Sequence, residues 1–153
     1  MEDTATTAIL LIDDDEDCLL FMRESIEEFH DGPVHEANSG GDALNFLCRR
    51  GGYEGAPAIG LVYLDVEMPG MHGQDVLKKI RSNAEFDALP VVMMSAVTDD
   101  AEIRRAARSG ANSYVVKPHD VVEFAKTLET ATRYWLGIHK RPGSSEPPSL
   151  STT

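Results

Sequence analysis

Acidic side chains crowd the end of the first apolar run in this sequence. In the stretch ILLIDDDED, Asp13, Asp14 and Asp15 directly follow four aliphatic residues. Carboxylates this close repel one another, and burying any of them is costly, so a metal ion, a cationic ligand or solvation must relieve the repulsion. Asp65 ends a later apolar run. A carboxylate in such a place can attack a phosphoryl group and form an acyl phosphate.

Short apolar runs alternate with longer amphipathic stretches along the chain. Runs that predict buried strands span residues 8–12, 58–65, 89–96 and 113–116, and a weaker strand lies within 32–39. Apolar residues at helical spacing predict helices in 18–29, 40–50, 73–81, 99–109 and 120–135. This alternation predicts an α/β fold: a doubly wound, five-stranded parallel sheet of the flavodoxin-like kind, covered by helices on both faces.

The polar residues that end these runs should meet at one edge of the sheet. In a doubly wound sheet the ligand site lies beyond the carboxyl ends of the strands. Asp13 and Asp14, Asp65 and Ser95 each follow or end a predicted strand, and the last strand leads into Lys117. We therefore expect these groups to share one site.

Composition restricts the partners and the compartment. The 153 residues include 14 basic and 26 acidic side chains, a net charge of −12, which opposes nucleic acid or an anionic membrane as a direct partner. Cys18 and Cys48 are isolated, which favours a reducing compartment, and we expect a cytoplasmic protein. No apolar run reaches the roughly 18 residues that a membrane helix needs.

The chain is organised as one domain with polar ends. We expect a flexible N-terminus over residues 1–7 and a folded domain over 8–138. Residues 139–153 contain a Pro- and Ser-rich stretch, RPGSSEPPSLSTT, that predicts a flexible tail.

Four motifs, taken together, resemble the receiver domain of two-component response regulators, the family of the chemotaxis protein CheY. They are LIDDDED, LVYLDVEMPGMHG, VVMMSA and GANSYVVKP, in the order that the family shows. The long final helix ending in YWLG and the loop RRGGYEGAP resemble a narrower group, the single-domain regulators paired with phytochrome-type histidine kinases.

The resemblance implies a phosphorylation site with bound Mg²⁺. By that match Asp65 is the phosphoacceptor, Asp14 binds Mg²⁺ directly and Asp13 acts through water. Asp65 supplies another metal ligand, and the backbone carbonyl of Glu67 supplies a further one. Mg²⁺ suits a few carboxylates, retained waters and a phosphate oxygen.

The resemblance also implies phosphate-contacting and switch residues. Lys117 would contact the phosphoryl oxygens, and its bond to Pro118 would be cis. Ser95 matches the switch hydroxyl, which donates to the phosphoryl group, and the small Ala96 leaves room for it. Tyr114 matches the aromatic switch position, whose ring moves inward when the hydroxyl moves.

Most of these residues also have a purely structural interpretation. Asp65 could cap a turn at a strand end, and Asp13 and Asp14 could belong to a solvated helix N-terminus, where acids complement the helix dipole. Lys117 could be a surface lysine, and Tyr114 a half-buried strand residue.

Four positions depart from the common family pattern. Glu67 and Val97 occupy variable positions that flank the phosphate, and the acidic side chain of Glu67 adds negative charge there. His72 stands where an acid is frequent, and His119 stands where an aromatic residue is frequent. These departures bear on phosphoryl lifetime and docking specificity.

The function expected from this resemblance is a phosphorylation switch. A histidine kinase transfers a phosphoryl group to Asp65, and a downstream protein binds the altered surface. We expect a phosphoacceptor with self-phosphorylation and slow self-dephosphorylation, and not a catalytic enzyme. The alternatives are a pseudo-receiver that binds partners without phosphate, and an Asp-nucleophile phosphatase, whose DxD motif DVE faintly echoes.

A homodimer is a further expectation. Val121, Phe124, Leu128, Ala131 and Trp135 form one apolar stripe of the last helix, part of which must cover the sheet. Aromatic residues are favoured anchors in interfaces. We therefore expect two copies to associate through the last strand and helix.

Overall fold

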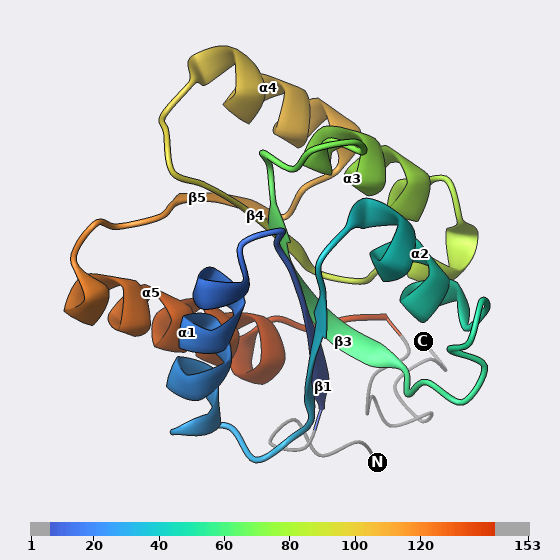
Figure 1. Ribbon diagram of the computed structural model, residues 1–153, viewed down its shortest axis with the longest axis horizontal. Helices are drawn as coiled ribbons and strands as arrows, with labels where there is room; N and C mark the ends of the chain where they lie inside the picture. The colour runs from blue at the N-terminus through green and yellow to red at the C-terminus, as the bar shows by residue number, and fades with distance from the viewer. Residues whose placement is uncertain (1–6, 143–153) are drawn as a thin grey trace, which may run out of the picture.

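The computed structural model describes residues 7–142, which form an α/β fold with one sheet between two layers of helices (Figure 1). The elements in order are β1 (Ala8–Ile12), α1 (Glu16–Glu27), β2 (Val34–Ala37), α2 (Gly40–Cys48), β3 (Ile59–Asp65), α3 (Gly73–Arg81), the 3₁₀ turn η2 (Ala84–Phe86), β4 (Val91–Ser95), α4 (Asp100–Ser109), β5 (Ser113–Val116), α5 (Val121–Arg133) and the π turn η3 (Tyr134–Ile138). The predicted alternation of strands and helices is confirmed.

All five strands are parallel and lie in the order β2-β1-β3-β4-β5. The order changes direction between β1 and β3, where Ile12 pairs with Leu64. This reversal is the topological switch point, at which open α/β sheets place their ligands. The predicted doubly wound, five-stranded sheet is therefore confirmed.

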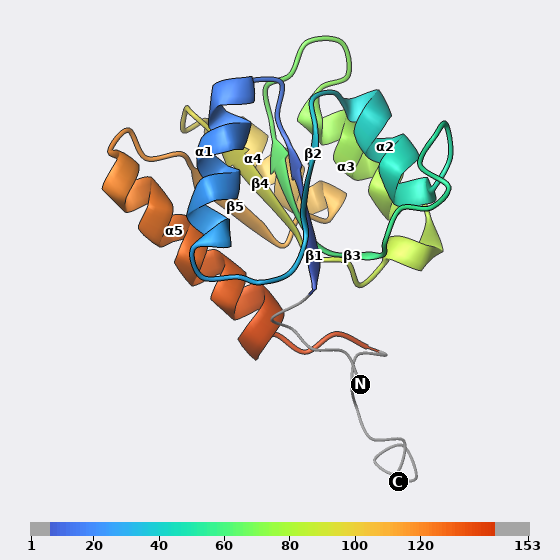
Figure 2. The same cartoon turned by 60° about the horizontal axis from the view of Figure 1, so that its bottom comes forward.

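Alternate strand residues supply two separate cores. Leu10 and Ile12 face the cluster that includes α2 and α3, whereas Ile9 and Leu11 face the cluster that includes α1 and α5. Figure 2 shows α1 and α5 on one side of the sheet and α2 and α3 on the other, and Figure 1 shows α4 beside α3. Because both faces are covered, β1 is buried along its whole length, which explains its uninterrupted apolar sequence.

The acidic run contributes to the start of α1 as well as to the site. The side chain of Asp15 caps the helix by accepting from the backbone amides of Asp17 and Cys18 at 3.0 and 3.3 Å. The helix therefore begins at Glu16, two residues before the predicted start. Glu16 and Asp17 lie in the first turn, where acids complement the helix dipole.

Two helices differ in how they meet the sheet. On α5, Phe124 and Leu128 are buried and Trp135 packs partly against the same cluster, whereas Val121 is 62% exposed. Most of the predicted apolar stripe thus covers the sheet. On α4, only Ala106 is buried, so this helix contributes little to the core.

Contacts at both ends extend slightly past the predicted domain limits. The Thr7 carbonyl accepts from Nε2 of His30 at 2.7 Å, and the Arg141 guanidinium donates to the Gly60 carbonyl at 3.3 Å. The flexibility predicted for residues 1–6 and 143–153 concerns segments outside the described residues, and the limits 8–138 stay a prediction. Within residues 7–142, no helix has the length and apolarity to cross a membrane.

Candidate functional site

The carboxyl ends of β1 and β3 bring three carboxylates together. Asp13 follows β1 and Asp65 ends β3, and these strands are neighbours in the sheet. Asp13, Asp14 and Asp65 each offer an oxygen within 4.8 Å of the others. Asp13 and Asp65 are 3% and 6% exposed, whereas Asp14 is exposed to solvent. The expected convergence of these residues is observed.

Lys117, which follows β5, extends its side chain into this cluster of carboxylates. Its Nζ donates to Asp13 Oδ2 at 2.7 Å and lies 3.0 Å from Asp65 Oδ1. The backbone amide of Lys117 donates to the Ser95 carbonyl at 2.7 Å, which fixes where the chain leaves β5. Burial alone would lower the pKa of Lys117, but the hydrogen bond and charge of Asp13, with the charge of Asp65, raise it. The lysine is therefore a permanent cation in this site.

The carboxyl group of Asp65 is more basic than an ordinary aspartate. Burial is the main cause, and the nearby charges of Asp13 and Asp14 act in the same direction, while Lys117 opposes them. Together they raise the pKa of Asp65 from 3.8 to about 6. The adjacent Cys18 thiol has its pKa raised to about 12, chiefly by burial, so it stays protonated at neutral pH.

The hydroxyl of Ser95 lies at the end of β4, beside β3. Asp65 pairs with Met94, so Ser95 is one position further along the neighbouring strand. Its Oγ donates to Glu67 Oε1 at 3.0 Å and accepts from the Val97 amide at 3.2 Å. Ala96, the next residue, is exposed at the start of the β4–α4 loop.

Tyr114 lies on β5, where it pairs with Met93 of β4. Its ring packs partly against the core and its hydroxyl oxygen is buried, without a hydrogen-bond partner among the described residues that meets normal geometry. Burial raises the pKa of Tyr114, and the proximity of Ser95 partly offsets this. The Tyr114 hydroxyl is thus directed inward and lies near the hydroxyl of Ser95.

The peptide bond before Pro118 differs from what the resemblance implied. Residues 7–142 contain no cis peptide bond, so the Lys117–Pro118 bond is trans and the expected cis bond is wrong for this structure. A trans bond is the ordinary choice, because the tertiary amide still favours trans by roughly 0.5–1 kcal/mol. The short contacts of the Lys117 ammonium group are made with this trans bond in place.

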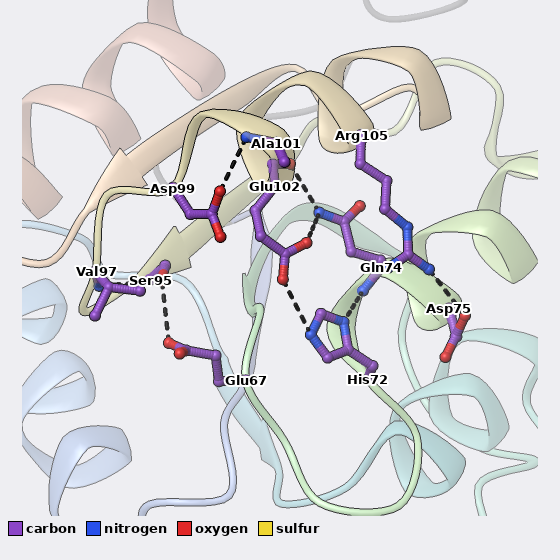
Figure 3. A network of polar contacts seen from close by, with 10 residues as sticks. All are labelled: Glu67, His72, Gln74, Asp75, Ser95, Val97, Asp99, Ala101, Glu102 and Arg105. Carbon is purple, nitrogen blue, oxygen red and sulfur yellow. Dashed lines mark hydrogen bonds and ion pairs between the residues drawn. The ribbon is translucent and has the colours of Figure 1, made fainter.

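A polar network between α3 and α4 was not predicted (Figure 3). His72 caps α3 by accepting from the Gln74 amide at 3.2 Å, and its Nε2 lies 3.4 Å from Glu102 Oε2 on α4. The side-chain amide of Gln74, through Nε2, donates to the backbone carbonyl and to a carboxylate oxygen of Glu102 at 3.0 and 3.2 Å. The sequence marks His72 only as a departure from the family pattern, and no motif indicates its contact with Glu102.

A glycine makes the turn from β3 into α3 possible. A Cβ on Gly73 would lie 2.2 Å from the Asp65 carbonyl oxygen and 2.8 Å from the Val66 Cα, both of which are backbone atoms. The helix therefore begins in direct contact with the strand that carries Asp65. This close approach places residues 72–74 directly beside the end of β3.

The donor set fits a small divalent cation. Mg²⁺ prefers oxygen ligands, and a few carboxylates with retained waters satisfy its octahedral geometry. Asp13, Asp14 and Asp65 provide such oxygens, two of them buried and one open to solvent. The cluster also has an excess of negative charge over the single ammonium of Lys117, which a divalent cation would neutralise.

The strand order and the acidic edge define a flavodoxin-like α/β protein whose polar site lies at the switch point of the sheet. The sequence model of the response regulator receiver domain matches residues 9–129, and the chain belongs to this family. It is therefore a receiver domain of two-component signalling, as the motifs predicted.

Two sequence relatives cover most of the chain. A probable methanogenesis regulatory protein, FilR2 of Methanothrix harundinacea, is 33% identical over 137 residues, which are 88% of this chain and 87% of that protein. The chemotaxis protein CheY-3 of Vibrio cholerae is 32% identical over 121 residues, 79% of this chain and 88% of that protein.

Solved structures of regulators associated with phytochromes share the fold. The phosphorylated cyanobacterial phytochrome response regulator RcpA superposes with a TM-score of 0.84 at 22% identity, covering 90% of this chain and 99% of that one. The Mn²⁺-bound response regulator Rcp1 gives 0.81 at 24% identity, covering 89% and 99%. The bacteriophytochrome response regulator AtBRR gives 0.72 at 25% identity, covering 88% and 95%.

Proposed function

We propose that this chain is a single-domain response regulator in which Asp65 accepts a phosphoryl group from a histidine kinase. The observation that carries the proposal is the position of Asp65. It is a buried carboxylate at the carboxyl edge of the sheet, 3.0 Å from the Lys117 ammonium and grouped with the oxygens of Asp13 and Asp14. A carboxylate that lies beside an ammonium group and other carboxylates is suited to phosphoryl transfer, because fixed charges can stabilise the charge that develops during the reaction.

The transfer needs an ionised nucleophile. With a pKa of about 6, Asp65 is mostly ionised at neutral pH and more basic than an ordinary aspartate. One carboxylate oxygen attacks phosphorus, the bond from phosphorus to the kinase imidazole nitrogen breaks, and the electron pair stays on that nitrogen. The product is an acyl phosphate on Asp65, and Lys117 offsets part of the negative charge that arrives.

Asp14 and Asp65 would bind Mg²⁺ directly and Asp13 would act through water, and the backbone carbonyl of Glu67 is proposed as a further ligand. Bound there, the ion would neutralise charge on the phosphoryl oxygens during transfer. The Mn²⁺-bound state of Rcp1 supports a divalent cation in this fold. The fit of the carboxylates in this chain is the more direct support.

The phosphoryl group would act through Ser95 and Tyr114. Ser95 can donate one hydrogen bond, so a new acceptor on Asp65 would change its partner. Tyr114 is next to this hydroxyl and lies on β5, close to the surface of α4 and α5. A local change would thus reach a surface that a downstream protein can bind. We also propose that the chain acts in the cytoplasm.

A phytochrome-type kinase is the proposed donor. The resemblance of the final helix and of the loop over residues 49–57 favours this pairing. AtBRR, described as a bacteriophytochrome response regulator, adds support because its identity to this chain reaches 25% over 88% of the residues. Phosphotransfer from such a kinase, compared with transfer from an unrelated kinase, would test the pairing.

A homodimer through β5 and α5 is also proposed. A groove of about 560 Å³ lies between these elements, and Trp135 and Ala131 are among its apolar lining residues. Glu123 and Lys126 lie on the same groove. In a twofold dimer the same surface meets itself, so the acid of one copy can face the base of the other.

The function is tested with acetyl phosphate and Mg²⁺, read by the mass of the intact protein. The wild type should gain one phosphoryl group, and Asp65→Asn should gain none while keeping its circular dichroism spectrum. Asp31→Asn, an exposed aspartate away from the site, is the matched control and should be phosphorylated normally. Stoichiometric phosphorylation of Asp65→Asn would show that another residue is the acceptor.

Two other outcomes correspond to the alternative functions. A wild type that accepts no phosphoryl group from acetyl phosphate or a kinase would be a pseudo-receiver. Repeated turnover of a generic aryl phosphate would indicate an Asp-nucleophile phosphatase. The second is disfavoured because Asp65 ends β3, whereas the nucleophile of that class lies on the first strand.

A further inference from the structure

The hydroxyl of Ser95 has its one proton committed to another acid. Ser95 is 1% exposed, and its Oγ donates to Oε1 of Glu67, two residues after Asp65, at 3.0 Å. The same oxygen accepts from the Val97 amide at 3.2 Å. Figure 3 shows the contact between Ser95 and Glu67. A serine hydroxyl has a single hydrogen to donate. It can therefore serve Glu67 or a phosphoryl oxygen, but not both.

We propose that Glu67 is a positioning residue whose carboxylate competes with the phosphoryl group for the Ser95 hydroxyl. The inference rests on the proposed function, because it needs phosphorylation of Asp65 and a response of Ser95. It assigns to the Glu67 side chain a role distinct from the one proposed for its backbone carbonyl. The Glu67 carboxylate keeps the Ser95 hydroxyl in its unphosphorylated position and determines how readily this hydroxyl moves to a phosphoryl oxygen.

The hydrogen bond between Ser95 and Glu67 is strong, and a phosphoryl group can still displace it. A hydrogen bond to a charged acceptor is stronger than one to a neutral acceptor. Glu67 itself is exposed, so its carboxylate is rehydrated when Ser95 leaves it. A fully buried carboxylate would lose its only partner and resist release. The exposed position therefore gives a contact that a phosphoryl group can displace.

Release of Ser95 also frees the loop that leads to α4. Movement of Oγ toward the phosphoryl group would take it away from the Val97 amide, whose hydrogen it now accepts, so residues 96–99 would have to rearrange. The start of α4 follows directly, and Glu102 on that helix contacts His72 and Gln74 of α3. The competition at Ser95 is thus connected to the α3–α4 network by a short stretch of chain.

Simple charge repulsion between Glu67 and the phosphoryl group is the competing explanation, and two comparisons separate the two. The measured quantity is the dissociation constant of beryllofluoride, a phosphoryl mimic, in the presence of Mg²⁺. It is determined for the wild type, Glu67→Gln and Glu67→Ala, and for each of these in a Ser95→Ala background. Asp99→Asn is the control, because it removes a charge from the nearby loop and Asn still caps α4.

Competition for the hydroxyl predicts a graded result. Glu67→Ala should tighten mimic binding by about tenfold, which corresponds to about 1.4 kcal/mol. Glu67→Gln should tighten it less, because its amide oxygen still accepts from Ser95. In the Ser95→Ala background neither substitution should change the dissociation constant, and Asp99→Asn should leave it unchanged in both backgrounds.

Charge repulsion predicts an ungraded effect that does not depend on Ser95, and that result would overturn the proposal. Glu67→Gln and Glu67→Ala would then tighten binding equally, and the effect would persist without Ser95. Unchanged binding in both Glu67 variants would also overturn it. Should Ser95→Ala bind no mimic, the order of the Gln and Ala variants decides alone. A wild type that binds no mimic and accepts no phosphoryl group contradicts the proposed function instead.

Discussion

Nζ of Lys117 lies 2.7 Å from Oδ2 of Asp13, although the two residues are 104 positions apart in the chain. The lysine follows the edge strand β5 and reaches past β4 and β3 to the end of β1. Its ammonium group is the cation that makes burial of Asp13 tolerable. This one contact therefore joins the stability of the fold to the chemistry of the site.

Lys117→Met should destabilise the protein when divalent cations are chelated. Removing one partner of a buried ion pair leaves an uncompensated charge, which costs on the order of 3 kcal/mol. Urea denaturation in a chelator should show this loss of unfolding free energy, and excess Mg²⁺ should restore part of it. Lys79→Met, at an exposed position on α3, should change stability by less than about 0.5 kcal/mol. Equal stability of Lys117→Met and the wild type would show that the pair contributes nothing.

Mg²⁺ should stabilise the protein through Asp14. A ligand that binds only the folded state stabilises by RT ln(1 + [L]/Kd), and each kcal/mol raises the melting temperature of a chain this size by about 3 °C. Asp14→Ala should abolish this Mg²⁺-dependent rise in a thermal melt, and it should stabilise the metal-free protein by relieving repulsion. Asp17→Ala, on the exposed first turn of α1, should keep the full rise. A rise of wild-type size in Asp14→Ala would place the metal elsewhere.

The titration of Asp65 predicts a fall in stability with rising pH. The pKa of Asp65 is about 6 in the folded protein and 3.8 in an ordinary environment, so between these values the folded state holds a proton that the unfolded state has released. The contribution of Asp65 to the free energy of unfolding therefore declines through this window and is constant above it. Urea denaturation in a chelator from pH 4 to 7 measures the decline.

Asp65→Asn serves as the reference for this measurement because Asn does not titrate. Its unfolding free energy should exceed that of the wild type by about 3 kcal/mol at pH 7, and the two should converge near pH 4. A difference that stays constant with pH would mean that the pKa of Asp65 is not raised.

Trp135→Ala should weaken the proposed homodimer. Truncation of an aromatic interface anchor commonly weakens binding more than tenfold. Because Trp135 also packs partly against the core, Tyr134→Ala provides a second variant, at a residue that is 44% exposed. Sedimentation equilibrium, with and without beryllofluoride, measures the dimer, and Leu20→Ala on α1 is the control. A wild type that stays monomeric at high concentration under both conditions would refute the dimer.

The sheet could be predicted from sequence because each strand carries its own signal. Strands buried on both faces have uninterrupted apolar sequences, and the run over 8–12 matches the fully buried β1 residue for residue. The run over 113–116 also matches β5, although this edge strand has no buried residue. Helix ends were harder to predict. The start of α1 depends on the side chain of Asp15, which caps the helix, and the apolar spacing that predicted the helix does not include this residue.

The site could be predicted only as a set of residue positions. Parallel strands bring their carboxyl ends together, so Asp13, Asp65 and Lys117 had to converge. Which oxygens they share depends on side-chain torsions, and so does the bond between Ser95 and Glu67. The trans bond at Pro118 departs from the family resemblance and is the isomer that an X–Pro bond ordinarily adopts.

The shallow burial of α4 has a consequence for how this protein opens. With Ala106 as its single buried residue, α4 can separate from the sheet at a small part of the global unfolding free energy, since few apolar contacts are lost. β1 and β3, buried on both faces, open only when the whole domain unfolds. Amide hydrogens of α4 should therefore exchange with solvent much faster than those of the central strands, and one surface can fluctuate while the sheet that carries Asp65 stays intact.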